Sequence, residues 1–225
     1  MTLDLLVVAP HPDDAELGAG GTLAKAARAG RTVGVVDLTR GELGSKGDPK
    51  TRAREADEAA RVLGLALREN LGFPDGGLTD DAGMAAVLAE RIRALKPRVV
   101  LGPHPDDRHP DHVGAAALVH RAVHLAGLAR ADVEGRPHKP ERLLHYPGNT
   151  PVRPDLLVDV SGVIEAWEAA VRAFASQFAG EDVSETVGPA GLEARRALRR
   201  YWGNLAGVAY AEPFVSPRPW LVDLP

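Results

Sequence analysis

The chain has 225 residues, 44% of them hydrophobic and 26% charged, which is ordinary for a globular protein. This length suits one compact domain, or one domain with an embellishment. The 31 acidic and 27 basic residues leave a net charge of −4, which argues against a nucleic-acid partner. No apolar run reaches the roughly 18 residues that span a membrane, and residues 1–4 lack the basic start of a signal peptide. We therefore expect a soluble, cytoplasmic protein.

The sequence contains no cysteine. This excludes disulfides, thiolate catalysis, iron–sulfur clusters and cysteine-based zinc sites. Any metal ion must therefore be bound by histidine and carboxylate side chains.

Short apolar runs alternate with helical segments through the first part of the chain. Strands are predicted at residues 3–9, 32–38, 70–73 and 98–102. Helices are predicted at residues 16–29, 49–63 and 82–95, and the first two end at the glycines Gly30 and Gly64. Strands that alternate with helices of this length are typical of βαβ units. The sequence thus predicts an α/β fold with a mostly parallel sheet and helices on both faces.

The last third of the chain has a different pattern. Strands are predicted at residues 142–146 and 156–160, and helices at residues 163–178 and 192–205. The proline-rich residues 213–219 are expected to pack on the body as an extended tail. We expect a single domain over residues 1–225, in which residues 141–225 form a C-terminal α/β extension to residues 1–128.

Two loops at strand ends hold the densest clusters of polar residues. Residues 10–16 follow the first predicted strand with the sequence Pro-His-Pro-Asp-Asp-Ala-Glu, and residues 103–112 follow the strand at 98–102. Four of the eight histidines lie in these two loops, with carboxylates beside each. Ligands of open α/β sheets bind beyond the carboxyl ends of the strands. The two loops are therefore expected to form one site.

The residue types in these loops suit a catalytic metal ion. Zn²⁺ accepts imidazole and carboxylate ligands, and a catalytic site keeps one position open for water. His11 and Asp14 are three residues apart at a strand-to-helix turn, so both can point into one site. Asp13 is then a carboxylate beside the metal that need not bind it, and such a group can take a proton from water.

Spacing alone leaves two questions open. The third ligand can be His104, His109 or His112, and the repeated Pro-His-Pro-Asp-Asp sequence even suggests a symmetric pairing of His11 with His104. A single His-Pro-Asp-Asp turn is also often only a helix start, at which Asp caps free amide groups.

At these residues the chain resembles the LmbE-like, or PIG-L type, N-acetylglucosaminide deacetylases, which are zinc hydrolases with a Rossmann-like fold. The resemblance rests on residues 11–16 and 109–112, and extends to residues 20–22, 37–42, 70–75 and 176–178. It covers the chain from Leu3 to about Pro213. Within the family, the chain is most similar to the bacillithiol-pathway deacetylases, which act on N-acetylglucosaminyl malate.

The resemblance implies roles for the residues in both loops. It makes Asp13 the general base and places His109 where the family stabilises the oxyanion or protonates the leaving amine. The zinc ligands that it implies are His11, Asp14 and His112.

Three further residues receive roles from the same comparison. Asp111 is a carboxylate that can orient a neighbouring imidazole. Arg52 matches a substrate-binding arginine, and Asp75 corresponds to a contact with sugar hydroxyls. His104 has no counterpart, which makes the symmetric pairing with His11 a poor prediction.

The expected activity is metal-dependent hydrolysis of the N-acetyl group of an N-acetylglucosamine conjugate, with N-acetylglucosaminyl malate as the substrate. Zn²⁺ is the expected cofactor, although two histidines and an aspartate also accept Fe²⁺ or Co²⁺. The alternatives are a deacetylase of another glycoside, such as diacetylchitobiose, and a Rossmann-like sugar- or nucleotide-binding protein without activity. The expected partner is a small glycoconjugate, and homologues imply a homo-oligomer such as a hexamer.

His120 and His124 lie four residues apart on a predicted helix, a spacing that can also bind a metal ion. We interpret them as surface or edge histidines.

Overall fold

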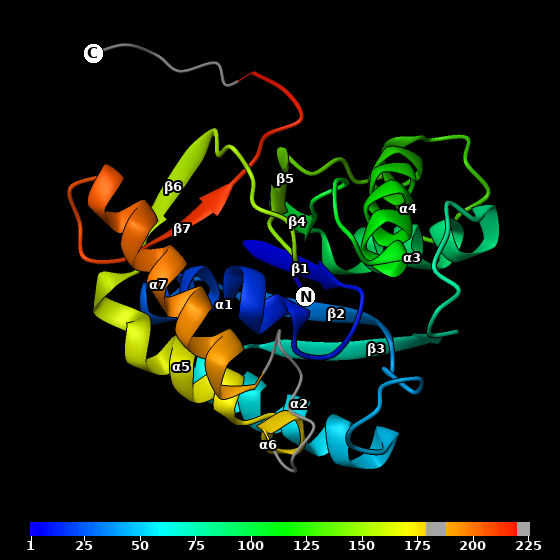
Figure 1. Cartoon of the computed structure of the whole chain (residues 1–225). Helices are drawn as coiled ribbons and strands as arrows, with labels where there is room; N and C mark the ends of the chain where they lie inside the picture. Colours follow the sequence, from blue (N-terminus) through cyan, green and yellow to red (C-terminus); the bar gives the residue numbers. More distant parts are fainter. Residues whose placement is uncertain (179–187, 220–225) are drawn as a thin grey trace, which may run out of the picture.

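The computed structural model describes residues 1–178 and 188–219, and Figure 1 shows their arrangement around a parallel sheet. The sheet has five strands in the order β3-β2-β1-β4-β5. Every neighbouring pair in it runs parallel. The strands are β1 (Leu5–Ala9), β2 (Val33–Thr39), β3 (Leu67–Phe73), β4 (Val99–Pro103) and β5 (Arg142–Tyr146).

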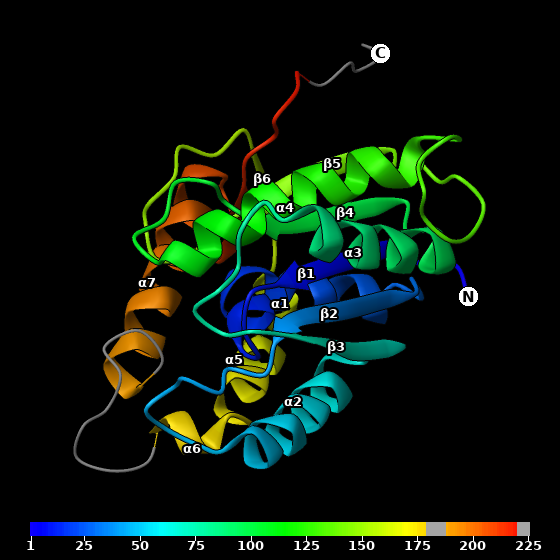
Figure 2. The ribbon, with the colours of Figure 1, turned by 90° about the vertical axis from the view of Figure 1, so that its right-hand side faces the viewer.

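Helices cover both faces of this sheet. Figure 2 shows α3 and α4 on one side of the strands, and α2 and α5 on the other. The helices are α1 (Asp14–Arg28), α2 (Pro49–Leu63), α3 (Ala82–Leu95), α4 (Pro110–Gly127), α5 (Ile164–Arg172), α6 (Ala175–Phe178) and α7 (Pro189–Leu205), with a 3₁₀ turn at Ser161–Val163. The predicted α/β fold is confirmed. No helix among residues 1–178 and 188–219 is long and apolar enough to cross a bilayer.

Most of the core lies in two apolar layers separated by the sheet. Side chains of β1 alternate between them, because successive residues of a strand point to opposite faces. Leu5 and Val7 pack in the layer with α1, α2 and α5, whereas Leu6 and Val8 pack in the layer with α3 and α4. All five residues of β1 are buried, which explains why this strand is almost continuously apolar in sequence.

A small antiparallel sheet lies beside the main one. It pairs β6 (Leu156–Asp159) with β7 (Ala211–Phe214). An antiparallel bridge between His145 and Val215 connects it to β5. The predicted proline-rich tail therefore begins as a strand. β5 belongs to the segment that we assigned to the C-terminal extension, yet it completes the parallel sheet.

Helix ends follow the sequence closely where capping residues are present. The side chain of Asp48 accepts hydrogen bonds from the backbone N–H groups of Lys50 and Thr51, and Gly64 ends α2 in a left-handed conformation. The bounds of α2 and α3 are those predicted. The helix predicted over residues 163–178 is divided instead, because α5 ends at Arg172 and a separate turn begins at Ala175.

The strand order determines where the polar loops meet. β1 pairs with β2 on one side and with β4 on the other. The chain therefore adds β2 and β3 on one side of β1 and then β4 and β5 on the opposite side, which makes the gap between β1 and β4 the switch point of the sheet. In doubly wound sheets this switch point opens a crevice at the carboxyl ends of the strands. The loops after β1 and β4 both lie at this crevice.

Candidate active site

The turn after β1 places three functional side chains at the start of α1. Asp13 has a φ of 108°, a left-handed conformation that is unfavourable for a residue with a Cβ atom. Its carboxylate does not cap the helix. Asp14 instead accepts a hydrogen bond from the backbone N–H of His11 at 3.1 Å. The turn is therefore more than a capped helix start, and both carboxylates are directed to other partners.

His11, Asp14 and His112 converge on one point. Oδ2 of Asp14 lies 3.1 Å from Nδ1 of His11 and 3.2 Å from Nε2 of His112. Ligand atoms of all three residues lie within 4.8 Å of one another. Two ligands of a tetrahedral Zn²⁺ are separated by about 3.3 Å, given bond lengths of about 2.0–2.1 Å. The spacing and the donor types therefore fit a divalent metal ion with an open position.

The far nitrogen of each imidazole faces a second carboxylate. Nε2 of His11 lies 3.2 Å from Oδ2 of Asp111 and 3.1 Å from Oδ1 of Asp75. Nδ1 of His112 lies 3.2 Å from Oδ2 of Asp107, although this contact lacks the alignment of a good hydrogen bond. Carboxylates in such positions orient metal-binding histidines and fix their tautomers.

The surrounding carboxylates make the site favourable for positive charge. Burial alone would lower the pKa of His11, but the hydrogen bond with Asp14 and the charges of Asp14 and Asp75 raise it to about 9. Burial opposes the same effect at His112, whose pKa is raised to about 10 by Asp14 and Asp107. An environment that stabilises protons on two buried imidazoles also favours a divalent cation in place of those protons.

Asp13 lies outside this ligand group and contacts Arg52. Oδ2 of Asp13 accepts a hydrogen bond from Nη2 of Arg52 at 3.0 Å, and both side chains are more than nine-tenths buried. Burial raises the pKa of Asp13 to about 7, against the opposing charge of Arg52. A carboxylate with a pKa near neutrality can both accept and return a proton, as a general base requires.

His109 lies at the mouth of the site. Its Nδ1 accepts a hydrogen bond from the backbone N–H of Asp111 at 3.2 Å, which caps α4. Burial and the charges of His11 and His112 lower the pKa of His109, which favours the neutral ring. The neutral ring then carries its proton on Nε2. His109 also forms an alternative metal-binding group with His11 and Asp111.

Asp111 and Asp75 tie neighbouring loops to the site. Asp111 accepts hydrogen bonds from the backbone N–H groups of Gly76 at 2.7 Å and Leu78 at 3.1 Å. Asp75 accepts one from the backbone N–H of Leu43 at 2.8 Å. Through these bonds the loops after β2 and β3 are fixed around His11.

A cavity of about 570 Å³ opens above the ligand group, within the usual range for small-molecule sites. His11, Asp13, Asp14, Arg52, Asp75, His109 and His112 all line it. Its lining also includes the cationic residues Lys46, Arg108 and Arg195, the last contributed by α7. Every predicted site residue therefore lines this cavity except Asp111, which lies directly behind His11.

Sequence reasoning assigned no role to Asp107, Arg108 or Arg195. Asp107 precedes His109 by two residues and looks like an ordinary loop carboxylate until the fold places it against His112. His104 is separate from the site: its Nδ1 contacts the backbone N–H of Asp106, and it belongs to neither potential metal-binding group of the described residues. The repeated sequence therefore does not produce a symmetric pair.

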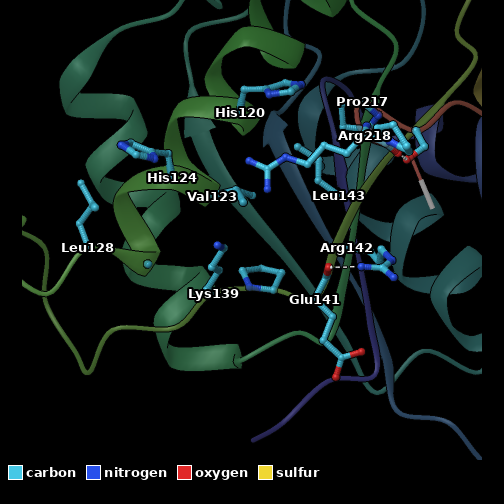
Figure 3. Close-up of a pocket in the computed structure, with 14 residues that line it drawn as sticks. His120, Val123, His124, Leu128, Lys139, Glu141, Arg142, Leu143, Pro217 and Arg218 are labelled. Atoms are coloured by element: carbon cyan, nitrogen blue, oxygen red, sulfur yellow. Dashed lines mark hydrogen bonds between the residues drawn. The ribbon is translucent and has the colours of Figure 1, made fainter. Parts of the chain in front are cut away.

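A second cavity, of about 630 Å³, lies between α4, the start of β5 and residues 216–219 (Figure 3). His120 and His124 of α4 both line it. Nε2 of His120 is 2.9 Å from Nε2 of His145, whose Nδ1 contacts the carbonyl oxygen of Pro103 at 2.8 Å. Within residues 1–178 and 188–219, neither His120 nor His124 belongs to a metal-binding group of three or more side chains.

The chain is similar in sequence and structure to known deacetylases. The family model described as PIG-L, GlcNAc-PI de-N-acetylase, matches residues 6–123. The diacetylchitobiose deacetylase of Thermococcus kodakarensis is 33% identical over 223 residues, which cover 92% of this chain and 80% of the relative.

Solved structures extend the likeness to nearly the whole fold. A conserved protein of Thermus thermophilus is 58% identical with a TM-score of 0.93, covering 99% of this chain and 98% of that one. The N,N′-diacetylchitobiose deacetylase of Pyrococcus horikoshii is 27% identical with a TM-score of 0.82, covering 93% and 82%. The chain belongs to the PIG-L family of N-deacetylases, a family of hydrolases.

Proposed function

We propose that the protein hydrolyses the N-acetyl group of N-acetylglucosaminyl malate, the substrate of the bacillithiol pathway, with Zn²⁺ bound by His11, Asp14 and His112. Deacetylation of N-acetylglucosamine-type substrates is supported by the relatives. The observation that carries the proposal is the ligand group itself, which does not include Asp13 although Asp13 lines the same cavity. This is the arrangement that a hydrolase needs and that a sugar-binding protein does not.

The malate conjugate is favoured by the cationic residues that line the cavity. Lys46, Arg108 and Arg195 line it, and cationic side chains of this kind bind carboxylates. Diacetylchitobiose, a neutral substrate, is the second candidate because relatives that cover most of the chain act on it.

The chemistry of the reaction can be assigned to named side chains. Asp13 takes a proton from the attacking water while the water oxygen bonds to the acetyl carbonyl carbon. His109 donates a hydrogen bond from Nε2 to the oxyanion of the tetrahedral intermediate. Asp13 then returns this proton to the glucosamine nitrogen, and the C–N bond breaks to release acetate. When bound, Zn²⁺ would lower the pKa of water and polarise the carbonyl group of the substrate.

The remaining side chains are given supporting roles. Asp111 orients His11, and Asp75 and Arg52 line the cavity where sugar hydroxyls would lie. Fe²⁺ and Co²⁺ are alternatives to Zn²⁺ for this donor set. A cytoplasmic location and a homo-oligomeric state, such as a hexamer, stay predictions, and sedimentation of the purified protein tests the latter.

The test is acetate release from N-acetylglucosaminyl malate, diacetylchitobiose and free N-acetylglucosamine, before and after chelation and on addition of Zn²⁺, Fe²⁺ or Co²⁺. We expect fast turnover of the malate conjugate that chelation abolishes and one of these ions restores. Turnover of the neutral sugars only would retain the deacetylase and exclude the malate substrate. No acetate from any of them, with metal present, would leave the binding protein as the better hypothesis.

A further inference from the structure

We infer that Arg52 is a positioning residue, which holds the Asp13 carboxylate and the strained turn that carries it in the place required for proton transfer. The inference rests on the proposed function, because it takes Asp13 to be the general base. It also differs from the role that family resemblance gives Arg52, which is contact with the substrate.

The guanidinium of Arg52 is engaged by the protein on several sides. Nη2 donates hydrogen bonds to the carbonyl oxygen of Pro12 at 2.5 Å and to Oδ2 of Asp13 at 3.0 Å. Nη1 donates to the carbonyl oxygen of Gly41 at 3.3 Å. The residue is only 6% exposed. One planar group thus connects α2 with the loops after β1 and β2, a task that suits the fixed fork of arginine.

The backbone of Asp13 needs such a partner. Its φ of 108° is disfavoured for any residue with a side chain, and such conformations persist only where the surroundings hold them. Arg52 binds the turn at two points, at the carbonyl oxygen of Pro12 and at the carboxylate of Asp13. Because α1 gives this carboxylate no capping bond, Arg52 is the group that fixes its direction.

The loop after β2 closes tightly over the guanidinium. A Cβ atom at Gly41, which has a φ of +65°, would lie 2.0 Å from Nη1 of Arg52. A Cβ atom at Gly44 would lie 3.2 Å from the same nitrogen. The backbone therefore packs directly on the guanidinium. Arg54 and Arg61 of the same helix are exposed, so the inward position is specific to Arg52.

The two roles predict different kinetics. A residue that binds the substrate equally in the ground and transition states raises KM when it is removed. A residue that acts through the general base lowers kcat, because it affects proton transfer and not binding. Arg52 also lines the cavity, so the experiment must separate these effects.

The experiment compares Arg52→Met and Arg52→Lys with the wild type, on whichever acetylated sugar the wild type hydrolyses. We expect Arg52→Met to lower kcat by about 100-fold, the loss that follows a misplaced catalytic group, with KM changed less than twofold. Arg52→Lys should recover part of kcat, since one ammonium can reach Asp13 but cannot also hold Pro12 and Gly41. Arg54→Met is the matched control on the same helix and should retain wild-type kinetics.

Two further measurements connect the effect to Asp13. In the Asp13→Asn background, Arg52→Met should cause little additional loss, because the group on which it acts is already absent. A crystal structure of Arg52→Met should show the Asp13 carboxylate displaced from its wild-type position. Metal analysis of the same variant should give the wild-type metal content.

A rise in KM at constant kcat, or losses that multiply in the double variant, would assign Arg52 to the substrate instead. An unchanged Asp13 turn in the Arg52→Met crystal would also overturn the inference, whatever the activity. Failure of the proposed function would be seen differently, as absence of acetate release by the wild type or as full activity of Asp13→Asn.

Discussion

Oδ2 of Asp107 lies 3.2 Å from Nδ1 of His112, and the carboxylate is almost fully buried. The backbone N–H groups of His109 and Asn149 donate to the same side chain at 2.8 and 2.7 Å. These bonds and the contact with His112 keep the pKa of Asp107 well below its usual range, although burial alone would raise it. A carboxylate fixed in this way keeps Nε2 of His112 directed at Asp14.

Replacing Asp107 should therefore weaken metal binding without removing a ligand. We expect Asp107→Ala to lower Zn²⁺ affinity by about 10- to 100-fold, as is usual for the carboxylate behind a metal-binding histidine. Competition with a fluorescent chelator measures this affinity. Asp106→Ala, at an exposed neighbouring position, is the control and should bind as the wild type does. Equal affinities of the two variants would show that His112 needs no orienting carboxylate.

Asp13 and Asp14 should differ in what their loss removes. Asp13→Asn should lower kcat by about 10²- to 10⁴-fold, the contribution of a positioned acid–base group, and should retain stoichiometric metal. Asp14→Asn should lose metal, because its carboxylate faces both His11 and His112. Metal analysis and acetate release on the same samples distinguish the two. A rate of Asp13→Asn within about threefold of the wild type, far short of that contribution, contradicts the assignment of the base.

The sequence predicted local structure well and tertiary neighbours poorly. The bounds of α2 follow from Asp48, Pro49 and Gly64, which act within a few residues of chain. The choice of His112 over His104 depends instead on how the loop after β4 leaves the sheet. Asp107 carried no signal in the sequence, because its importance comes from the fold placing it against His112. The division between α5 and α6 was missed for a related reason, since no glycine or proline marks it.

Gly41 offers an independent test of the packing around Arg52. Gly41→Ala and Gly30→Ala both place a side chain at positive φ, at +65° and +75°, which costs about 1–2 kcal/mol of stability in each case. Only Gly41→Ala also collides with Arg52, because nothing lies within 4 Å of a Cβ at Gly30. We expect the strain alone to lower the free energy of unfolding by a similar amount in both variants, as measured by chemical denaturation. Gly41→Ala should lose additional stability because of the collision. Its kcat should fall at least tenfold, on the order of a small misplacement of catalytic groups. Equal kcat values for the two variants would mean that the loop adapts.

His145 should make the fold less stable in acid. Burial lowers its pKa from 6.5 to about 4, and the charges of His120 and His104 act in the same direction. The stability that comes from its neutral form is complete above pH 6.5 and is lost as the pH falls from 6.5 towards 4. Between pH 7 and pH 5 this loss is about 2 kcal/mol, given 1.36 kcal/mol per pKa unit.

Urea unfolding at the two pH values measures this loss, with His145→Phe as the variant. The variant should lose about 2 kcal/mol less than the wild type between pH 7 and pH 5, whatever its stability at pH 7. His124→Gln, an exposed histidine on α4, should keep the wild-type dependence. A wild-type dependence in His145→Phe would place the acid-sensitive group elsewhere.

Arg108 provides the sharpest test of the anionic aglycone. It lines the cavity and is exposed, so its loss should not disturb the ligand group. If it pairs with a malate carboxylate, Arg108→Ala should raise KM for N-acetylglucosaminyl malate by about tenfold, or 1.4 kcal/mol, and leave KM for diacetylchitobiose unchanged. Added salt should weaken the same interaction in the wild type, since exposed charges are screened. Equal changes for both substrates would place Arg108 near the sugar and remove this argument for malate.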